Sequence, residues 1–113
     1  LFIIFHIMDS MSMLKLKVMK TFDDLKFTKH RVTKKAIMAS LELKPNVFIS
    51  VVAGEGMYST SRKGVRAECT KVEDASTFEV AIIDENLPDD EQQWDVVGWQ
   101  TRKDINKLII ENS

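Results

Sequence analysis

The side chains best suited to chemistry in this chain are two histidines, one cysteine and a run of acids. His6 and His30 are the only histidines, and Cys69 is the only cysteine. A structural zinc site needs about four Cys or His ligands at short spacings, and an activated nucleophile needs a base within reach. Neither pattern is present in the sequence, so we expect a surface or structural role for His30 and a packed thiol for Cys69.

Acids and glycines offer two further candidate sites. Carboxylates that could gather a divalent cation cluster in one segment, at Asp84, Glu85, Asp89, Asp90, Glu91 and Asp95. They lack the glycine-centred, alternate-residue spacing of a calcium loop, so an exposed acidic loop is expected. Gly54 and Gly56 could begin a phosphate-binding loop, but the third glycine, the lysine and the following helix are missing. We therefore predict no catalytic residue, no metal site, no cofactor and no enzymatic activity.

Basic and aromatic residues are better suited to binding a partner. Two basic stretches, 26–35 and 62–66, could meet phosphates while Tyr58 or Phe48 stacks on a base. The residues predicted for nucleic-acid binding are Lys29, Arg31, Lys34, Lys35 and Arg66. The residues predicted for protein binding are Tyr58, Arg62, Lys63 and Trp94. Trp99, on the other side of Gly98, could also anchor a protein contact, although we expect at least one of the two tryptophans to pack in the core. The alternative is an ordinary charged surface, because the formal net charge is only -1.

Length and composition predict one intracellular domain, placed in the cytoplasm. A chain of 113 residues is about one domain, and its single cysteine can form no intramolecular disulfide. The apolar opening LFIIFHIM is too short to cross a bilayer, so we expect no membrane association. Residues 1–18 are expected to be upstream sequence or an accessory arm, and 19–113 the domain. Within the arm, 14–18 alternates and could add an edge strand, through which a homo-oligomer could form.

A β-hairpin is the strongest structural signal in the sequence. Two runs of mostly alternating apolar residues occupy 34–52 and meet at Lys44, Pro45 and Asn46, which favour a turn. One face of the first strand is apolar, with Ile37, Ala39, Leu41 and Leu43. The second strand, 47–53, is apolar on both faces except Ser50, which predicts a central strand covered on both sides.

The remaining elements complete an α+β fold. Hydroxyl-to-carboxylate spacing predicts a helical turn at 21–25 and a C-terminal amphipathic helix after Thr101, with Ile105, Leu108 and Ile109 on its apolar stripe. Alternation predicts strands at 65–69 and 78–83, and a short strand at 94–99. Short connections between these strands favour an antiparallel meander of about five strands, with the helix packed on one face.

The order of motifs resembles a group of short phage-encoded proteins of unassigned function. The motifs are Met19-Lys20-Thr21-Phe22-Asp23-Asp24-Leu25-Lys26-Phe27 with His30, then 47–52, Gly56-Met57-Tyr58-Ser59, 78–82 and Asp95-Val96-Val97-Gly98-Trp99. This resemblance covers most of 19–113. It implies a phage or phage-derived accessory protein that starts near Met19, and it implies no known activity.

Taken together, these features favour a non-enzymatic protein that acts through protein–protein interaction. The expected partner is a host or phage protein, bound through an exposed sheet face, the 54–64 loop or a subunit interface. The alternative is a nucleic-acid-binding accessory module that uses the two basic stretches.

Overall fold

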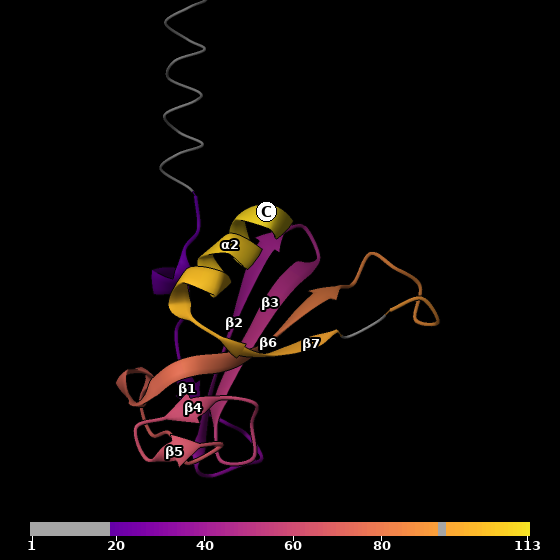
Figure 1. Cartoon of the computed structure of the whole chain (residues 1–113). Helices are drawn as coiled ribbons and strands as arrows, with labels where there is room; N and C mark the ends of the chain where they lie inside the picture. The colour runs from indigo at the N-terminus through magenta and orange to yellow at the C-terminus, as the bar shows by residue number, and fades with distance from the viewer. Residues whose placement is uncertain (1–18, 93–94) are drawn as a thin grey trace, which may run out of the picture.

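The computed structural model describes residues 19–92 and 95–113, which form an antiparallel sheet with a C-terminal helix packed against it (Figure 1). This confirms the α+β fold class. The elements in chain order are η1 (Phe22–Asp24), β1 (Thr28–Lys29), β2 (Ala36–Lys44), β3 (Val47–Gly54), β4 (Thr60–Ser61), β5 (Gly64–Val65), η2 (Val72–Asp74), β6 (Ala75–Asp84), β7 (Val96–Gln100) and α2 (Arg102–Asn112). The predicted arm 1–18, with its strand at 14–18, lies outside the described residues.

The predicted hairpin is confirmed as β2 and β3. The two strands pair antiparallel from Ala36 opposite Gly54 to Lys44 opposite Val47, with an irregularity between Glu42 and Lys44. Asn46 has a φ of 64°, a left-handed conformation that asparagine adopts more readily than most residues. The turn therefore follows from local sequence, and it fixes which side chains of the two strands share a face.

The order of strands in the sheet is β1-β2-β3-β6-β4-β5, and β7 also pairs with β6. Within the described residues the sheet thus has seven strands rather than about five, and β6 rather than β4 lies next to β3, so the strands do not follow one another as a simple meander. β3 lies between β2 and β6, which confirms its central position. β6 pairs with β3 along one edge, and its other edge pairs with β4 near its start and with β7 further along. The long strand β6 consequently brings residues near 60 and near 98 to the same edge.

The strand predicted at 65–69 is wrong beyond Val65. Arg66 has a φ of 58°, and this left-handed residue ends the extended chain. The Ala67 N–H then turns back to the carbonyl of Gly64, while the Cys69 N–H donates to the carbonyl of Lys35 at 3.0 Å. Cys69 is nevertheless buried, because that bond brings it against the end of the hairpin. Alternation therefore predicted the burial of Cys69, but it was wrong about the secondary structure and about Val65, which is 67% exposed.

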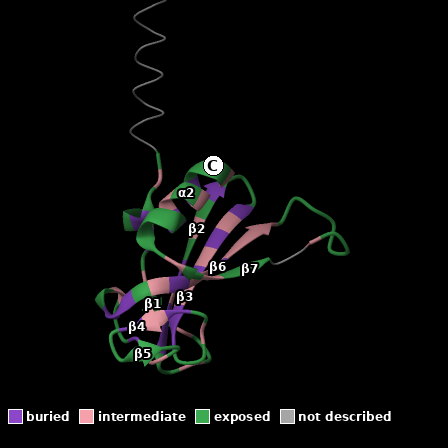
Figure 2. Cartoon of the chain, viewed as in Figure 1, coloured by how far each residue is buried: buried purple, intermediate pink, exposed green. Residues whose placement is uncertain are grey.

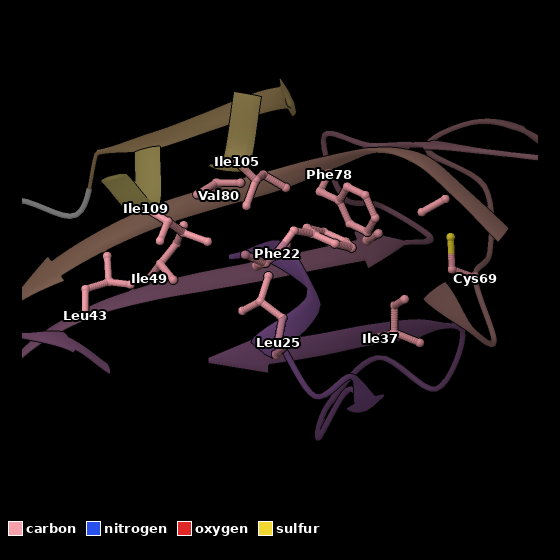
Figure 3. Close-up of a cluster of buried hydrophobic side chains, with 14 residues drawn as sticks. Phe22, Leu25, Ile37, Leu43, Ile49, Cys69, Phe78, Val80, Ile105 and Ile109 are labelled. Atoms are coloured by element: carbon pink, nitrogen blue, oxygen red, sulfur yellow. The ribbon is translucent and has the colours of Figure 1, made fainter. Parts of the chain in front are cut away.

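One face of the sheet carries the hydrophobic core and is called the covered face below. Its buried strand residues are Ile37, Ala39, Leu43, Ile49, Val51, Ala53, Phe78 and Val80. Phe22 of η1 and Ile105 and Ile109 of α2 pack on them (Figure 3). The rings of Phe22 and Phe78 lie 5.3 Å apart, a separation typical of favourable aromatic pairs. The helix and η1 thus close this side of the sheet.

The helix α2 is fixed at its start by the predicted capping box. The Thr101 hydroxyl accepts from the Asp104 N–H at 3.2 Å, and the Asp104 carboxylate accepts from the Thr101 N–H at 3.0 Å. The guanidinium of Arg102 lies over the rings of Phe22 and Phe78, with Cζ 5.3 and 5.2 Å from their centres. These contacts, together with the buried Ile105 and Ile109, confirm that the apolar stripe docks on the sheet.

The opposite side of the sheet, called the open face below, has no comparable cover within the described residues. The register places on it Met38, Ser40, Glu42, Phe48, Ser50, Val52, Glu79, Ala81, Ile83 and Val96. None of these side chains is buried. Most of the residues that alternate with them along β2, β3 and β6 point to the covered face and are buried (Figure 2). The prediction that β3 is covered on both sides is therefore wrong, and an apolar face remains partly exposed.

Candidate functional site

Three side chains form an exposed aromatic surface at the β6–β7 edge of the sheet: Tyr58, Arg66 and Trp99. The rings of Tyr58 and Trp99 lie 6.0 Å apart at an angle of 58°. The Arg66 Cζ lies 4.9 Å from the centre of the Tyr58 ring, within the range of a cation–π contact. Tyr58 is 48% exposed and Trp99 is 46% exposed. Two large rings and a cation are thus presented to solvent as one group.

Both the backbone N–H and the backbone carbonyl of Tyr58 form hydrogen bonds. Its N–H donates to the Glu79 carboxylate at 3.1 Å, and its carbonyl accepts from the Trp99 N–H at 2.9 Å. Gly98 permits this approach, because a Cβ at that position would lie 2.6 Å from the Cβ of Tyr58. The bonds place Tyr58 against β6 and β7 although it lies about forty residues earlier in the chain than Trp99.

Arg66 is fixed by the loop that follows β3. Its N–H donates to the carbonyl of Ser59 at 2.8 Å, and its carbonyl accepts from the N–H of Gly56 at 3.1 Å. Its guanidinium donates to the carbonyl of Gly56 at 2.7 Å. The Ser59 hydroxyl, fully buried, in turn accepts from the Gly54 N–H at 3.0 Å. The aromatic surface therefore rests on a loop with its own network of hydrogen bonds.

Trp99 joins this surface because of a bulge in β7. Val97 pairs with Val80 and Gln100 pairs with Phe78, so Gly98 and Trp99 together oppose the single residue Glu79. Trp99 has a φ of 59°, which turns it out of the regular alternation. The sequence identifies Trp99 as a possible anchor for a protein contact, but only Trp94 is among the predicted binding residues. The bulge itself had one signal in the sequence, since glycine inside a strand pattern indicates a bulge or a close backbone approach.

The predicted protein-binding residues are only partly brought together. Tyr58 belongs to the aromatic surface, while Trp94 lies outside the described residues. Arg62 and Lys63 follow β4 and line a pocket of about 230 Å³ with Glu68 and Asp74. The Arg62 Nε lies 3.2 Å from the Asp74 Oδ1, and Lys63 forms an ion pair with Glu68. These two cations face acids of their own chain.

The acids of this pocket are stabilised in their ionised forms. A hydrogen bond from the backbone N–H of Thr70 is the main cause that lowers the pKa of Asp74. The hydrogen bond and charge of Lys63 lower the pKa of Glu68 and, reciprocally, raise the pKa of Lys63. Because the paired charges compensate each other, this pocket presents less positive charge than its sequence suggests.

The predicted nucleic-acid residues separate into different environments. Arg66 belongs to the aromatic surface, and Lys35 lies 3.7 Å from the Glu55 carboxylate in an exposed ion pair. Arg31 and Lys34 are exposed on the turn after β1. Lys29 pairs with Ile37 in the register of β1 and β2 and so belongs to the side of the covered face. The two basic stretches therefore do not form one uninterrupted positive strip, since Glu55 and Glu68 stand among them.

The histidine and cysteine of the described region have structural surroundings. The His30 Nδ1 accepts from the N–H groups of Val32 and Thr33, at 3.2 and 3.1 Å, and so caps the turn after β1. Cys69 is 1% exposed, and burial raises the pKa of its thiol, which disfavours the reactive thiolate. Among residues 19–92 and 95–113, no three His, Cys, Asp or Glu side chains come close enough to hold a metal ion.

Comparison with known proteins gives no relative from which a function could be transferred. No protein-family model, no curated protein and no solved structure matches this chain. In the described parts of the chain, no helix has the length and apolar character needed to cross a membrane. The aromatic surface and the open face are therefore the candidate functional surfaces of the described residues.

Proposed function

We propose that this domain is a non-enzymatic binding module that recognises a partner protein through its aromatic surface. The main support for this proposal is that Tyr58 and Trp99 are each about half exposed while the backbone beneath them is fixed by hydrogen bonds. Surface aromatics normally lose conformational entropy on binding, and a fixed backbone reduces that cost.

The composition of the surface supports a protein partner. Tyrosine, tryptophan and arginine are the residues that most often carry the binding energy of protein interfaces. Val96 of β7, which pairs with Ala81 on the open face, is 51% exposed and adds apolar area at the same edge of the sheet. The resemblance to short phage-encoded proteins makes a host or phage protein in the host cytoplasm the expected partner.

The test is quantitative capture of the partner by single-residue variants. Tagged wild-type chain, Tyr58→Ala, Trp99→Ala and the control Ile110→Ala would be expressed in phage-infected cells, and the proteins bound to each would be quantified. Ile110 is 58% exposed on α2, and its substitution removes comparable apolar area away from the surface. A hot-spot loss of about 2 kcal/mol corresponds to roughly thirtyfold weaker binding for the Tyr58 and Trp99 variants.

One result of this capture experiment would contradict the proposed binding surface. If the same proteins bind to wild type, Tyr58→Ala, Trp99→Ala and Ile110→Ala in equal amounts, the aromatic surface does not bind the partner. Thermal unfolding of each variant by circular dichroism separates loss of binding from loss of folding.

A further inference from the structure

A groove of about 450 Å³ lies on the open face beside β1, away from the aromatic surface. Its floor is formed by side chains of β2 and β3, chiefly Met38, Ser40, Ser50 and Val52. Its rim is formed by Lys26 and Thr28 and by the turn that follows β1, with His30, Arg31 and Val32. This volume falls within the usual range for sites of small organic ligands.

The register explains the shape of the groove. Ser40 lies opposite Ser50, which lies opposite Ala81, so a row of small side chains crosses three strands. Larger residues flank this row, with Met38 and Val52 on one side and Phe48 on the other. The flanking rows are four residues apart along each strand, or about 13 Å, which leaves room for a planar ring to lie on the small side chains.

The charges at the rim have one sign. The cations Lys26 and Arg31 line the groove, and its lining includes no acid. Within the described residues, neither Lys26 nor Arg31 takes part in an ion pair of the kind that occupies Arg62 and Lys63. Because the His30 Nδ1 accepts two N–H groups, its Nε2 carries the proton and can donate a hydrogen bond.

We propose that this groove binds single-stranded nucleic acid, one nucleotide in the groove and its phosphates at Lys26 and Arg31. An anionic ligand with a flat apolar portion matches a cationic rim over a floor of small and aliphatic side chains. Single strands expose their bases to such a floor, whereas in a duplex the bases are stacked inside. This activity goes beyond the proposed protein binding and depends on different residues.

Acids on the open face restrict where the phosphates lie. Glu42 and Glu79 are the acids among the residues of this face named above, and Glu79 accepts the Tyr58 N–H. Glu42 lies in the row with Phe48, on the far side of the serine row from Met38. Both carboxylates would repel phosphate. The nucleic acid therefore follows the β1 edge of the sheet, past Lys26 and Arg31. The modest number of cations there predicts weak, salt-sensitive binding.

Fluorescence anisotropy with a labelled single strand of about 12 nucleotides tests this proposal. With two phosphate contacts, affinity should fall about sevenfold between about 50 and about 200 mM salt. The double variant Lys26→Glu, Arg31→Glu should bind at least about tenfold more weakly than wild type. The control Lys103→Glu, Lys107→Glu makes the same change of charge on α2 and should retain wild-type affinity within about twofold.

Competition and one further variant distinguish binding in the groove from binding elsewhere on the protein. A duplex of the same sequence and an acidic peptide should each compete poorly with the single strand, and Tyr58→Ala should leave the affinity unchanged. Free adenosine monophosphate should compete only at much higher concentration, because it offers one phosphate.

Several results would contradict binding of a single strand in the groove. The proposal is wrong if wild type does not bind at low salt, if the two charge-reversal variants weaken binding equally, or if duplex or peptide competes as well as the single strand. It is also wrong if Tyr58→Ala weakens binding as much as the groove variant, which would place the strand on the aromatic surface.

Discussion

The two faces of one sheet differ in what their side chains do. On the covered face, Ile49, Val51 and Phe78 are fully buried beneath α2 and η1. On the open face, the residues that alternate with them, such as Phe48 and Val52, stay partly exposed within the described structure. Both faces belong to the same strands and share one register, so backbone pairing does not explain the difference.

The difference lies in the elements that cover each face. Arg102 and Asn106 attach α2 to the first face: Arg102 donates to the carbonyls of Val72 and Ala75, both at 3.0 Å, and Asn106 accepts the Phe22 N–H at 2.7 Å. The two edges of the sheet differ as well, with the aromatic surface beside β7 and the cationic groove beside β1. One face therefore supplies most of the apolar burial that stabilises the fold, whereas the other has no comparable cover from the residues that the structure describes.

The largest expected effect compares one phenylalanine from each face. Phe78→Ala should lower the free energy of unfolding by about 4 kcal/mol, because it removes a fully buried ring that contacts Phe22 and Phe27. Phe48→Ala removes the same atoms from a partly exposed position and should cost about half as much or less. Urea unfolding with equal m-values measures both. Equal losses would mean that the open face is also covered in solution.

Much of this contrast could be predicted from sequence. Alternation identified the hairpin and the apolar face of its first strand, and the spacing of Thr101 and Asp104 identified the start of the helix. These features depend on residues close together in the chain, where side-chain periodicity and capping act directly. Exposure of the second face of β3 could not be predicted, because Phe48 and Val52 are as apolar as core residues. Only the placement of α2 decides which face is covered.

The candidate site was less predictable than the fold. Tyr58 was identified by its residue type, but its contact with Trp99 depends on the pairing of β6 with both β4 and β7. The strand predicted at 94–99 is confirmed over 96–99 as part of β7, whereas residue 94 lies outside the described residues, and the bulge of this strand was not foreseen. The ion pairs of Arg62 and Lys63 depend on the path of the loop between β4 and β6. Such contacts arise from tertiary structure, which local patterns do not specify.

A smaller expected effect tests the link between the aromatic surface and the strand beneath it. Gly98→Ala places a Cβ 2.6 Å from the Cβ of Tyr58, so Tyr58 must move. We expect a loss of about 2 kcal/mol in unfolding free energy, together with loss of partner binding. Val97→Ala, a neighbouring change at a half-exposed position, should cost less than about 1 kcal/mol and should retain binding. If Gly98→Ala binds the partner as well as wild type, the position of Tyr58 is not required for recognition.

The smallest expected effect is a pH dependence of the unfolding free energy that arises from Asp104, at the start of the helix α2 on the covered face. The hydrogen bond from the backbone N–H of Thr101 is the main cause that lowers the pKa of Asp104. A carboxyl whose pKa is lower in the folded state stabilises the fold above its unfolded pKa of about 4, and that stabilisation is lost as pH falls through the folded pKa. Asp104→Asn removes this titration, so the stability difference between wild type and variant should shrink from about pH 6 toward about pH 3.

Urea midpoints of the two proteins over this pH range measure the effect. A difference that stays constant would show that the Asp104 carboxylate does not stabilise the start of α2 through its charge. If the difference shrinks as expected, acid weakens the start of the helix that covers the core, because the ionised Asp104 carboxylate no longer accepts from the Thr101 N–H.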